Sequence, residues 1–328
     1  MRAPAFWYRP PDRPGIAARL LTPLGWITAK LRSRQPSEPE PLTLPVPVIC
    51  LRTLTPRHSG MVPAVIALVQ HLERLGHRAV VACKAGRMGP EEAVEVDPAR
   101  HRAEEVGDDA MLIAAFTKVW VARDATSAAR SAARAGAVVI TLEDGRGPRV
   151  LSPDIRIVVA DAIEGFGNGL CRPAGPLREP VASALSAADL LLSIGPPKAQ
   201  KLFEAHWAGA ITGPHLRGQL EPLQTGMDWQ GASLLAFTGI GTPEGFFASL
   251  RGLGATLLRA ETMEAHQPLT RALMARLDGE ASALGAQLVT TERDAMRLPL
   301  EFRQKVLTLP LRLRIENGAL LDHVLAEL

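Results

Sequence analysis

Aromatic residues are scarce in this chain, at 4% of its 328 residues. Hydrophobic residues nevertheless make up 47% and charged residues 22%, as in a globular protein with a well-formed core. That core must be built mainly from Ala, Leu and Val, which fits the helix-on-sheet layers of α/β folds. The formal net charge is only +3, so the composition predicts no nucleic-acid partner.

Cysteine is also rare, and its three copies, Cys50, Cys83 and Cys171, lie far apart in the chain. They show neither the spacing of a metal site nor the even number of a disulfide framework. Cys50 and Cys83 lie inside apolar runs. We therefore expect buried thiols in a protein of a reducing compartment.

A cleavable signal peptide and a membrane span are both lacking. The chain opens with Pro4, aromatic residues and Pro10–Pro11, instead of a basic start followed by an apolar stretch. No run approaches the roughly 20 apolar residues that cross a bilayer. We expect a cytoplasmic protein, which can still contact a membrane at its surface.

Positive charge is concentrated near the N-terminus. Residues 1–34 contain one acid, Asp12, and a set of basic residues: Arg2, Arg9, Arg13, Arg19, Lys30, Arg32 and Arg34. Within residues 14–34, apolar side chains recur on one helical stripe beside Trp26: Ile16, Leu20, Leu24, Ile27 and Leu31. Pro23 and Gly25 predict a break or kink in this helix. A basic amphipathic helix with a Trp can lie among lipid headgroups, or its stripe can pack on the protein body, and the sequence leaves both open.

Residues 35–47 are rich in proline and predict an extended linker. After it, short apolar runs alternate with helical segments rich in Ala and Leu. This alternation is typical of a largely parallel sheet that is covered on both faces. The expected strands are 46–51, 79–83, 119–122, 138–142, 155–160 and 190–194, and the expected helices include 63–75 and 126–135.

A second series of strands is expected at 233–237, 255–258, 287–290 and 306–313, with helices at 244–250 and 269–284. Residues 196–231 show no regular pattern and predict an irregular connection. We therefore divide the chain into three parts: an N-terminal helix and linker (1–45), a large α/β domain (46–230) and a smaller C-terminal α/β lobe (231–328).

The loop after the first expected strand, RTLTPRHSGMVP at 52–63, stands where a nucleotide kinase cradles phosphates. That chemistry requires glycines for close backbone approach, a Lys for the β- and γ-phosphates, and a Ser or Thr for Mg²⁺. Gly60 is present, but Met61 and Val62 follow it, and neither side chain can bind a phosphate or a metal. Taken alone, this stretch is not a phosphate-binding loop.

Motifs along the rest of the chain are long and occur in a distinctive order. They are FWYRPPDRPGIAARLLTPLGW (6–26), VDPARH (96–101), VGDDA (106–110), VWVARD (119–124), GFGNGLCRPAGPLREP (165–180), AFTGIGTPEGFF (236–247), HQPLT (266–270) and VTTERDAMRLP (289–299). On these motifs the chain resembles the tetraacyldisaccharide 4'-kinase (lipid A 4'-kinase) family nearly end to end. The resemblance implies a P-loop-kinase-like α/β fold: a largely parallel sheet with helices on both faces, a smaller C-terminal α/β lobe and an N-terminal amphipathic helix.

The nucleotide side departs from the family. The family's loop reads roughly GNLTVGGTGKTP and aligns without a gap, so that Arg57 and His58 replace two glycines, Met61 the Lys and Val62 the Thr. The family's SRGYGG appears here as CKAGRMG at 83–89, and its DDGFQN as EDGRGP at 143–148. Three motifs on this side are altered together.

The resemblance also implies roles for individual residues. Asp108, assisted by His266, would deprotonate the acceptor hydroxyl, and Asp109 stands where the family has Glu. The remaining implied residues are Ser59, Gly60 and Arg178 for a degenerate ATP site, and Glu143, Asp144 and Glu179 for Mg²⁺. Without the resemblance, Asp108 and Asp109 would read as a solvated helix start, and Arg178–Glu179 as an exposed ion pair.

Two functions remain open from the sequence. One is an ATP- and Mg²⁺-dependent kinase that phosphorylates the 4'-hydroxyl of the lipid A disaccharide precursor at the cytoplasmic face of the inner membrane. The other is a pseudokinase that binds the lipid or a partner on the same scaffold, with no cofactor. Removing one preorganised group typically costs about 10²–10³ in rate. Because the Lys and the Thr are both replaced, the sequence predicts weak or absent activity.

Overall fold

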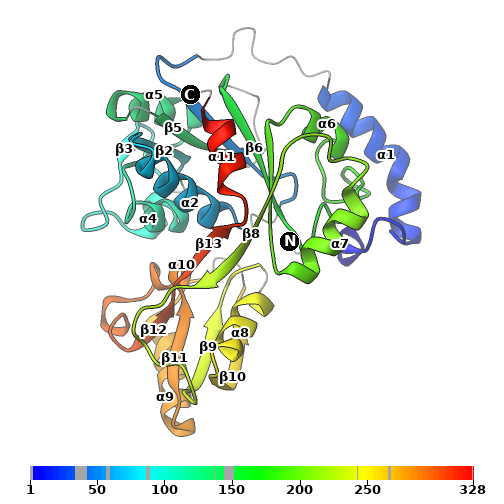
Figure 1. Ribbon diagram of the computed structural model, residues 1–328. Helices are drawn as coiled ribbons and strands as arrows, with labels where there is room; N and C mark the ends of the chain where they lie inside the picture. The colour runs from blue at the N-terminus through cyan, green and yellow to red at the C-terminus, as the bar shows by residue number, and fades with distance from the viewer. Residues whose placement is uncertain are drawn as a thin grey trace.

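The computed structural model describes residues 3–33, 43–56, 60–85, 89–136, 138–143, 151–241, 243–264, 267–326 and 328. Two lobes are visible, one around a nine-stranded sheet and one around a four-stranded sheet (Figure 1). Across the large sheet the order is β13 (Leu311–Ile315), β8 (His215–Pro222), β7 (Leu190–Ile194), β6 (Ile155–Asp161), β1 (Val48–Arg52), β5 (Val138–Glu143), β2 (Ala79–Lys84), β4 (Val119–Ala122) and β3 (Val94–Glu95). Only the two edge strands, β13 and β3, run antiparallel to their neighbours among these described strands.

The small sheet is parallel throughout its described pairs, in the order β10 (Thr256–Thr262), β9 (Ser233–Thr238), β11 (Gln287–Thr291) and β12 (Val306–Leu309). The helices are η1 (Ala5–Tyr8), α1 (Ile16–Ser33), α2 (Met61–Arg74), α3 (Ala103–Val106), α4 (Asp108–Ile113), α5 (Ala125–Ala135), α6 (Val181–Ser186), α7 (Pro197–Trp207), α8 (Pro243–Gly252), α9 (Arg271–Leu284), α10 (Glu292–Ala295), η2 (Leu300–Phe302) and α11 (Gly318–Leu325). The predicted fold class is confirmed.

Side chains along the central strand β1 point alternately to the two faces of the large sheet, and each face has its own apolar cluster. Ile49 and Leu51 pack in one cluster with side chains of α2, α4 and α11. Val48, from the opposite face, packs in another cluster with the alanines of α5. Side chains that alternate in this way on a strand point to opposite faces, so both faces of this buried sheet must be apolar.

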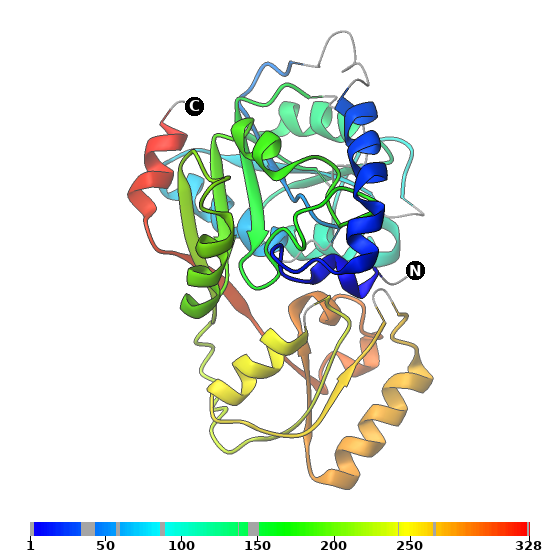
Figure 2. The ribbon, with the colours of Figure 1, turned by 90° about the vertical axis from the view of Figure 1, so that its right-hand side faces the viewer.

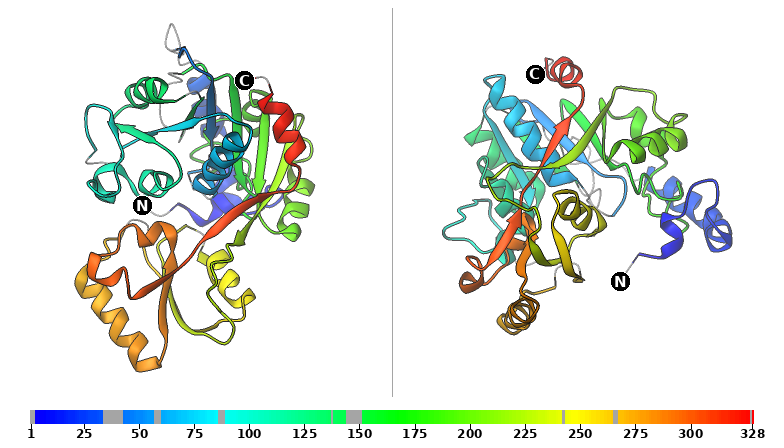
Figure 3. Two further views of the ribbon diagram at one scale, coloured as in Figure 1. Left: turned by 60° about the vertical axis from the view of Figure 1, so that its left-hand side comes forward. Right: turned by 60° about the horizontal axis from the view of Figure 1, so that its bottom comes forward.

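The two lobes are joined by a pair of antiparallel strands. β8 leaves the large sheet toward the small lobe and β13 returns beside it, in a register from Leu311 with Pro222 to Ile315 with Gly218. The left view of Figure 3 shows the pair running between the lobes. The proposed C-terminal lobe, 231–328, stays a proposal about folding units. Its last two elements, β13 and α11, lie with the large sheet.

Two expectations about secondary structure were wrong. Residues 196–231 are not irregular, because they contain α7 and β8. The sequence HLRGQLEP of β8 has few apolar side chains, since the strand is only partly buried, and so it lacks a strand-like pattern. The expected strand 306–313 is divided at Pro310 into β12 of the small sheet and β13 of the large sheet.

Helix α1 is continuous through Pro23, so the predicted break is also wrong. It lies on the outside of the large lobe (Figure 2). Ala18 is fully buried, and Gly25 lies against the segment around Cys171. A Cβ at Gly25 would lie 2.7 Å from the carbonyl oxygen of Cys171, so only glycine allows this close approach. The stripe points away from the body, which excludes the alternative that it packs there; its exposed fractions are Ile16 79%, Leu20 75%, Leu24 51%, Ile27 54% and Leu31 61%.

Among the described helices, none combines the length and apolar content that a bilayer crossing requires. Cys50, Cys83 and Cys171 are buried free thiols, as predicted. Burial is also the main reason why the pKa of the Cys171 thiol is raised.

A buried polar cluster joins β7, β8 and α7. Ser193 Oγ donates to Gln200 Oε1 at 2.6 Å, and the Gln200 amide donates to the Ser193 carbonyl at 2.9 Å. Because the single hydroxyl proton is used, His215 Nε2, 2.7 Å away, donates its own proton to Ser193 Oγ. Burial lowers the pKa of His215 below its usual 6.5, and the nearby Glu204 charge opposes this effect.

We expect His215 to make the fold less stable in mild acid. Because its pKa is lowered in the folded state, His215 binds fewer protons there than in the unfolded chain when the pH is below 6.5. Its contribution to the free energy of unfolding is therefore complete above that pH and declines as the pH falls. Urea unfolding at about pH 7.5 and about pH 5.5 should show a smaller acid-induced loss for His215→Gln than for wild type. His206→Gln, at an exposed position of α7, should leave the loss unchanged. Equal losses in wild type and His215→Gln would contradict the expectation.

Candidate active site

The centre of the candidate site is Asp294, a buried carboxylate of the VTTERD motif that is 1% exposed. It accepts hydrogen bonds from Thr238 Oγ1 at 2.7 Å, from the Gly239 amide at 3.0 Å and from Thr291 Oγ1 at 2.8 Å. Thr291 also caps α10, because its Oγ1 accepts from the Asp294 amide at 3.2 Å. The motifs AFTGIG and VTTERD, far apart in sequence, thus meet at the carboxyl ends of β9 and β11.

Asp294 also pairs with Arg297, and Arg297 reaches the large lobe. Its Nε lies 3.3 Å from Asp108 Oδ2, in a charge contact that lacks hydrogen-bond geometry, and both side chains are 11% exposed. Its Nη1 donates to the carbonyl oxygen of Gln267 at 3.1 Å. The predicted base Asp108 and the residue after His266 are therefore held by the same guanidinium. His266 itself lies outside the described residues, so its pairing with Asp108 stays a prediction.

Two more charged contacts tie α10 to the large lobe. Arg293 Nε lies 2.9 Å from Asp109 Oδ1, and Arg293 Nη2 donates a hydrogen bond to Asp109 Oδ2 at 3.3 Å. Arg312 of β13 holds the Glu292 carboxylate with both Nη atoms, at 2.7 and 3.0 Å, while its guanidinium carbon lies 5.0 Å from the Phe116 ring centroid. The charge of Asp109 also adds to burial in raising the pKa of the Cys83 thiol.

Asp108 and Asp109 were predicted from the sequence, but the arginines that hold them were not. Arg293, Asp294 and Arg297 stood in the VTTERDAMRLP motif, but their partners are distant in sequence. The signal available was the charge pattern: acids at 108 and 109 at the start of a short helix, and a motif with two arginines elsewhere. Only the folded structure shows which arginine contacts which acid.

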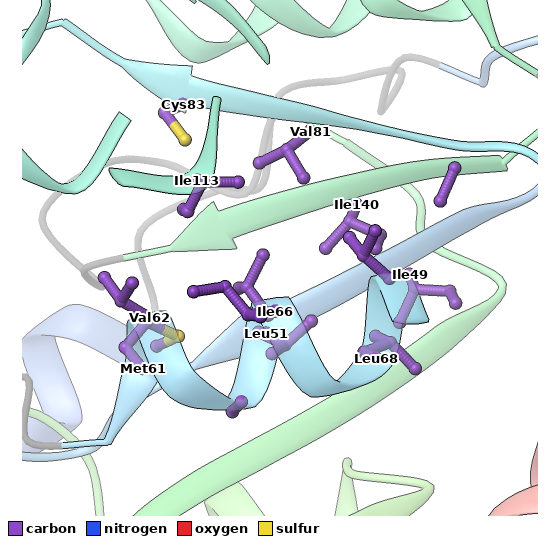
Figure 4. Close-up of a cluster of buried hydrophobic side chains, with 14 of the residues drawn as sticks. Ile49, Leu51, Met61, Val62, Ile66, Leu68, Val81, Cys83, Ile113 and Ile140 are labelled. Carbon is purple, nitrogen blue, oxygen red and sulfur yellow. The ribbon is translucent and has the colours of Figure 1, made fainter. Parts of the chain in front are cut away.

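The nucleotide side is built on the first turn of α2, where Gly60 precedes the helix in the left-handed region at φ 83°. Met61 is 5% exposed and Val62 9% exposed. Figure 4 draws both at the start of α2, in the same apolar cluster as Leu51 and Ile113. The positions at which the family resemblance expects a Lys and a Thr are therefore part of the hydrophobic core. Ser59 lies outside the described residues, and Arg178 is half-buried one residue before Glu179.

The predicted metal ligands can be judged in part. Asp144 lies outside the described residues, and only the backbone of Glu143 is described, at the end of β5 beside Arg52 of β1. Glu179 is ion-paired with Arg52. Nowhere in the described ranges do three or more His, Cys, Asp or Glu form a group that could hold a metal. Two of the three predicted ligand side chains thus lie outside the described part of the chain, and the Mg²⁺ site stays a prediction.

The GFGNG segment positions the N-terminus. Gly165, Gly167 and Gly169 have φ of 55°, 60° and 74°, in the left-handed region that favours glycine. Asn168, buried between them, donates to the carbonyls of Phe6 at 3.2 Å and Ala174 at 2.9 Å. These bonds fix the segment that precedes α1 against the large lobe.

A loop that follows the central strand of a largely parallel sheet and opens into a helix has the strand–loop–helix arrangement of P-loop kinases, here without their Gly-Lys-Ser/Thr sequence. LpxK from Aquifex aeolicus, whose crystal structure was solved in complex with ATP, has the same fold: the TM-score is 0.73 over 95% of this chain and 99% of that chain, at 20% identity. At that identity the likeness establishes the fold alone.

Similarity in sequence shows the family as well as the fold. The profile of the tetraacyldisaccharide-1-P 4'-kinase family matches residues 17–328. The tetraacyldisaccharide 4'-kinase of Dinoroseobacter shibae is 49% identical, over 99% of this chain and 97% of that protein. Those of Jannaschia sp. and Rhodospirillum centenum are 46% and 43% identical, over 98% and 100% of this chain and 97% of each relative. The chain belongs to the tetraacyldisaccharide 4'-kinase family.

Proposed function

We propose that this chain recognises the lipid A disaccharide precursor of its family but transfers phosphate from ATP weakly or not at all. One observation carries the proposal: Met61 and Val62 are buried in the apolar core at the first turn of α2. Phosphoryl transfer depends on positioning and on neutralising the charge of the phosphates. An apolar first turn can do neither, apart from the backbone amides of the helix start.

The acceptor side supports retained recognition of the lipid. Asp108 lies at the start of α4, held by Arg297, where the family resemblance expects the base for the 4'-hydroxyl. Asp109 beside it is held by Arg293. These contacts hold both carboxylates in place at the boundary between the lobes, which supports a role in binding a hydroxylated, phosphorylated sugar.

The exposed stripe of α1 supports contact with a membrane surface. Its apolar side chains point to solvent, and Arg19 and Lys30 are exposed on the same helix. An interfacial helix buries such a stripe among acyl chains and places its basic residues at anionic headgroups. The proposed location is the cytoplasmic face of the inner membrane, where a lipid disaccharide precursor would be bound.

The second candidate is an active kinase whose ATP site is rebuilt from other residues. The 49% identity to a relative that carries the name of the kinase favours it. In that case ATP and Mg²⁺ would be bound without the Lys and the Thr of the family's loop.

Calorimetric titration of the protein with Mg²⁺-ATP separates the two candidates. Loss of two preorganised groups, at about 10²–10³ each in rate, predicts little or no phosphorylated disaccharide. Loss of the Lys and Thr contacts to the phosphates and Mg²⁺ predicts no saturable heat. Affinity in the micromolar range with turnover would overturn the proposal. Met61→Lys/Val62→Thr should raise ATP affinity. Met61→Leu/Val62→Ile, a change of similar size that adds no polar group, should not.

A further inference from the structure

Helix α1 lies on one loop of the large lobe, residues 165–176, which we call the docking loop; Figure 2 shows the helix along the outside of that lobe. Gly25 faces the docking loop, since a Cβ built on it would lie 2.7 Å from the Cys171 carbonyl oxygen. One turn further on, Thr28 Oγ1 donates a hydrogen bond to the Arg172 carbonyl oxygen. The middle of α1 therefore contacts backbone atoms of the docking loop directly.

The docking loop also holds the segment that precedes α1. The backbone amide of Asn168 donates to the carbonyl oxygen of Trp7 at 2.8 Å, and the Asn168 side chain donates to that of Phe6 at 3.2 Å. In the opposite direction, Trp7 Nε1 donates to the Pro173 carbonyl oxygen at 3.0 Å, and the Arg172 guanidinium carbon lies 5.4 Å from the Trp7 ring centroid. One loop thus contacts α1 at its middle and also the chain that leads into it.

Packing fixes the docking loop itself to the large lobe. Phe166 is 1% exposed, and its ring centroid lies 5.5 Å from that of Phe203 and 5.1 Å from that of Trp207, both on α7. Asn168, 2% exposed, also donates to the Ala174 carbonyl oxygen at 2.9 Å and so ties two parts of the loop together. The surface under α1 is therefore a packed part of the protein body.

Helix α1 has little of its own to keep it helical in water. Most helices of globular proteins are stabilised by packing an apolar face, and short isolated helices are marginal in water. The apolar stripe of α1 faces solvent, so it supplies no such packing. The helix also contains Pro23 and Gly25, and proline and glycine are the two least favourable residues inside a helix. The helical state of α1 must therefore depend on its contacts with the protein body, and the docking loop supplies those of Gly25 and Thr28.

We propose that the docking loop holds α1 as a preformed helix with its apolar stripe outward, so that the protein binds a lipid surface without a folding step. The inference rests on the proposed function for its partner, an anionic lipid surface, to which the exposed Arg19 and Lys30 of the helix are complementary in charge. A segment that folds as it binds spends part of its interaction free energy on becoming ordered. A docked helix avoids that cost, and its docking also fixes which way the protein faces on the surface.

Hydrogen–deuterium exchange of the lipid-free protein, followed by mass spectrometry of peptides from α1, tests the proposal. Wild-type α1 should exchange at least about tenfold more slowly than unstructured chain. Gly25→Ala introduces the residue that favours a helix most, yet its methyl group would meet the Cys171 carbonyl oxygen. We therefore expect exchange in α1 to become at least about tenfold faster in this variant, in spite of the better helix former.

Matched controls separate docking from helix propensity. Gly279 lies inside α9, and nothing lies within 4 Å of a Cβ built on it, so Gly279→Ala should slow exchange in α9. A second pair of variants tests the hydrogen bond to the docking loop. Thr28→Val removes the donor to that loop and should speed exchange in α1. Thr22→Val removes a hydroxyl that donates within the helix, to the Ala18 carbonyl oxygen at 2.9 Å, and should not.

Two results would overturn the proposal. One is a wild-type α1 that exchanges as fast as unstructured chain in the lipid-free protein, since the helix would then form only on the lipid. The other is a Gly25→Ala protein in which α1 exchanges no faster than in wild type, since the helix would then be stable without close contact with the docking loop. A wild-type α1 that is protected in water, in a protein that does not bind phosphatidylglycerol vesicles, would instead overturn the lipid partner of the proposed function and leave the docking of α1 intact.

Discussion

Replacing Asp294 by alanine is expected to lower the free energy of unfolding by about 3–5 kcal/mol, because breaking a buried ion pair from one side leaves the remaining charge poorly compensated. Arg297, 11% exposed, would lose the nearer of its two carboxylate partners and keep the longer contact with Asp108. Thr238, Thr291 and the Gly239 amide would each lose an acceptor that now lies within 3.0 Å. An unsatisfied buried donor carries its full desolvation cost.

Urea unfolding followed by circular dichroism measures the effect of this substitution. Asp294→Asn keeps the shape and one acceptor oxygen, so we expect a smaller loss of about 1–3 kcal/mol. Asp278→Ala is the matched control: it breaks an exposed pair with Lys305, 2.8 Å away, and should cost at most about 1 kcal/mol. An Asp294→Ala protein as stable as the control would mean that the cluster around Asp294 contributes little to the fold.

The elements of this fold were predictable wherever burial imposes a simple pattern on the sequence. β1 and β7 are mainly apolar, apart from Arg52 at the end of β1 and Ser193 in β7, because their sheet is covered on both faces, and the amphipathic α2 and α9 show helical spacing. β8 was missed for the same physical reason. It links the lobes, is only partly buried, and therefore has a mixed sequence that resembles a loop.

The candidate site was predictable only in its local parts. The sequence of the phosphate loop already indicated that Met61 and Val62 carry no ligand atoms, and their burial follows from their apolar character. The charged contacts were different, because Asp109 and Arg293 lie far apart in the chain and meet only after two lobes have folded. Charge patterns constrain neighbours on one helix, but they do not specify a partner in another domain.

The ion pairs between the two lobes are concentrated at one short segment, α10 and the residues just after it. α10 is only four residues long, yet Glu292, Arg293 and Arg297 just beyond it each reach the large lobe through an ion pair. Asp294, in the same turn, holds the small sheet together. Arg297 thus contacts both carboxylates, Asp294 of the small lobe and Asp108 of the large lobe.

Helix α1 gives the second large effect, on binding to membranes. Leu20→Glu/Ile27→Glu is expected to weaken binding to vesicles that contain anionic phosphatidylglycerol by about 10²–10⁴-fold. Both side chains are more than half exposed in the structure, so the protein body does not already bury them. Burial of one large aliphatic side chain is worth about 1.5–3 kcal/mol, and each 1.4 kcal/mol is about tenfold in affinity. Cosedimentation over a series of lipid concentrations measures the change.

A control of equal charge decides whether the stripe itself, rather than added negative charge, is responsible. Leu202→Glu/Leu300→Glu introduces the same charge at two exposed leucines on α7 and η2, outside α1. Repulsion from an anionic surface falls off within about 8 Å at physiological salt, so this variant should bind nearly as wild type does. Equal weakening by both variants would show that net charge governs binding. A wild type that does not sediment with the vesicles would contradict the expectation that the exposed stripe of α1 binds a membrane surface.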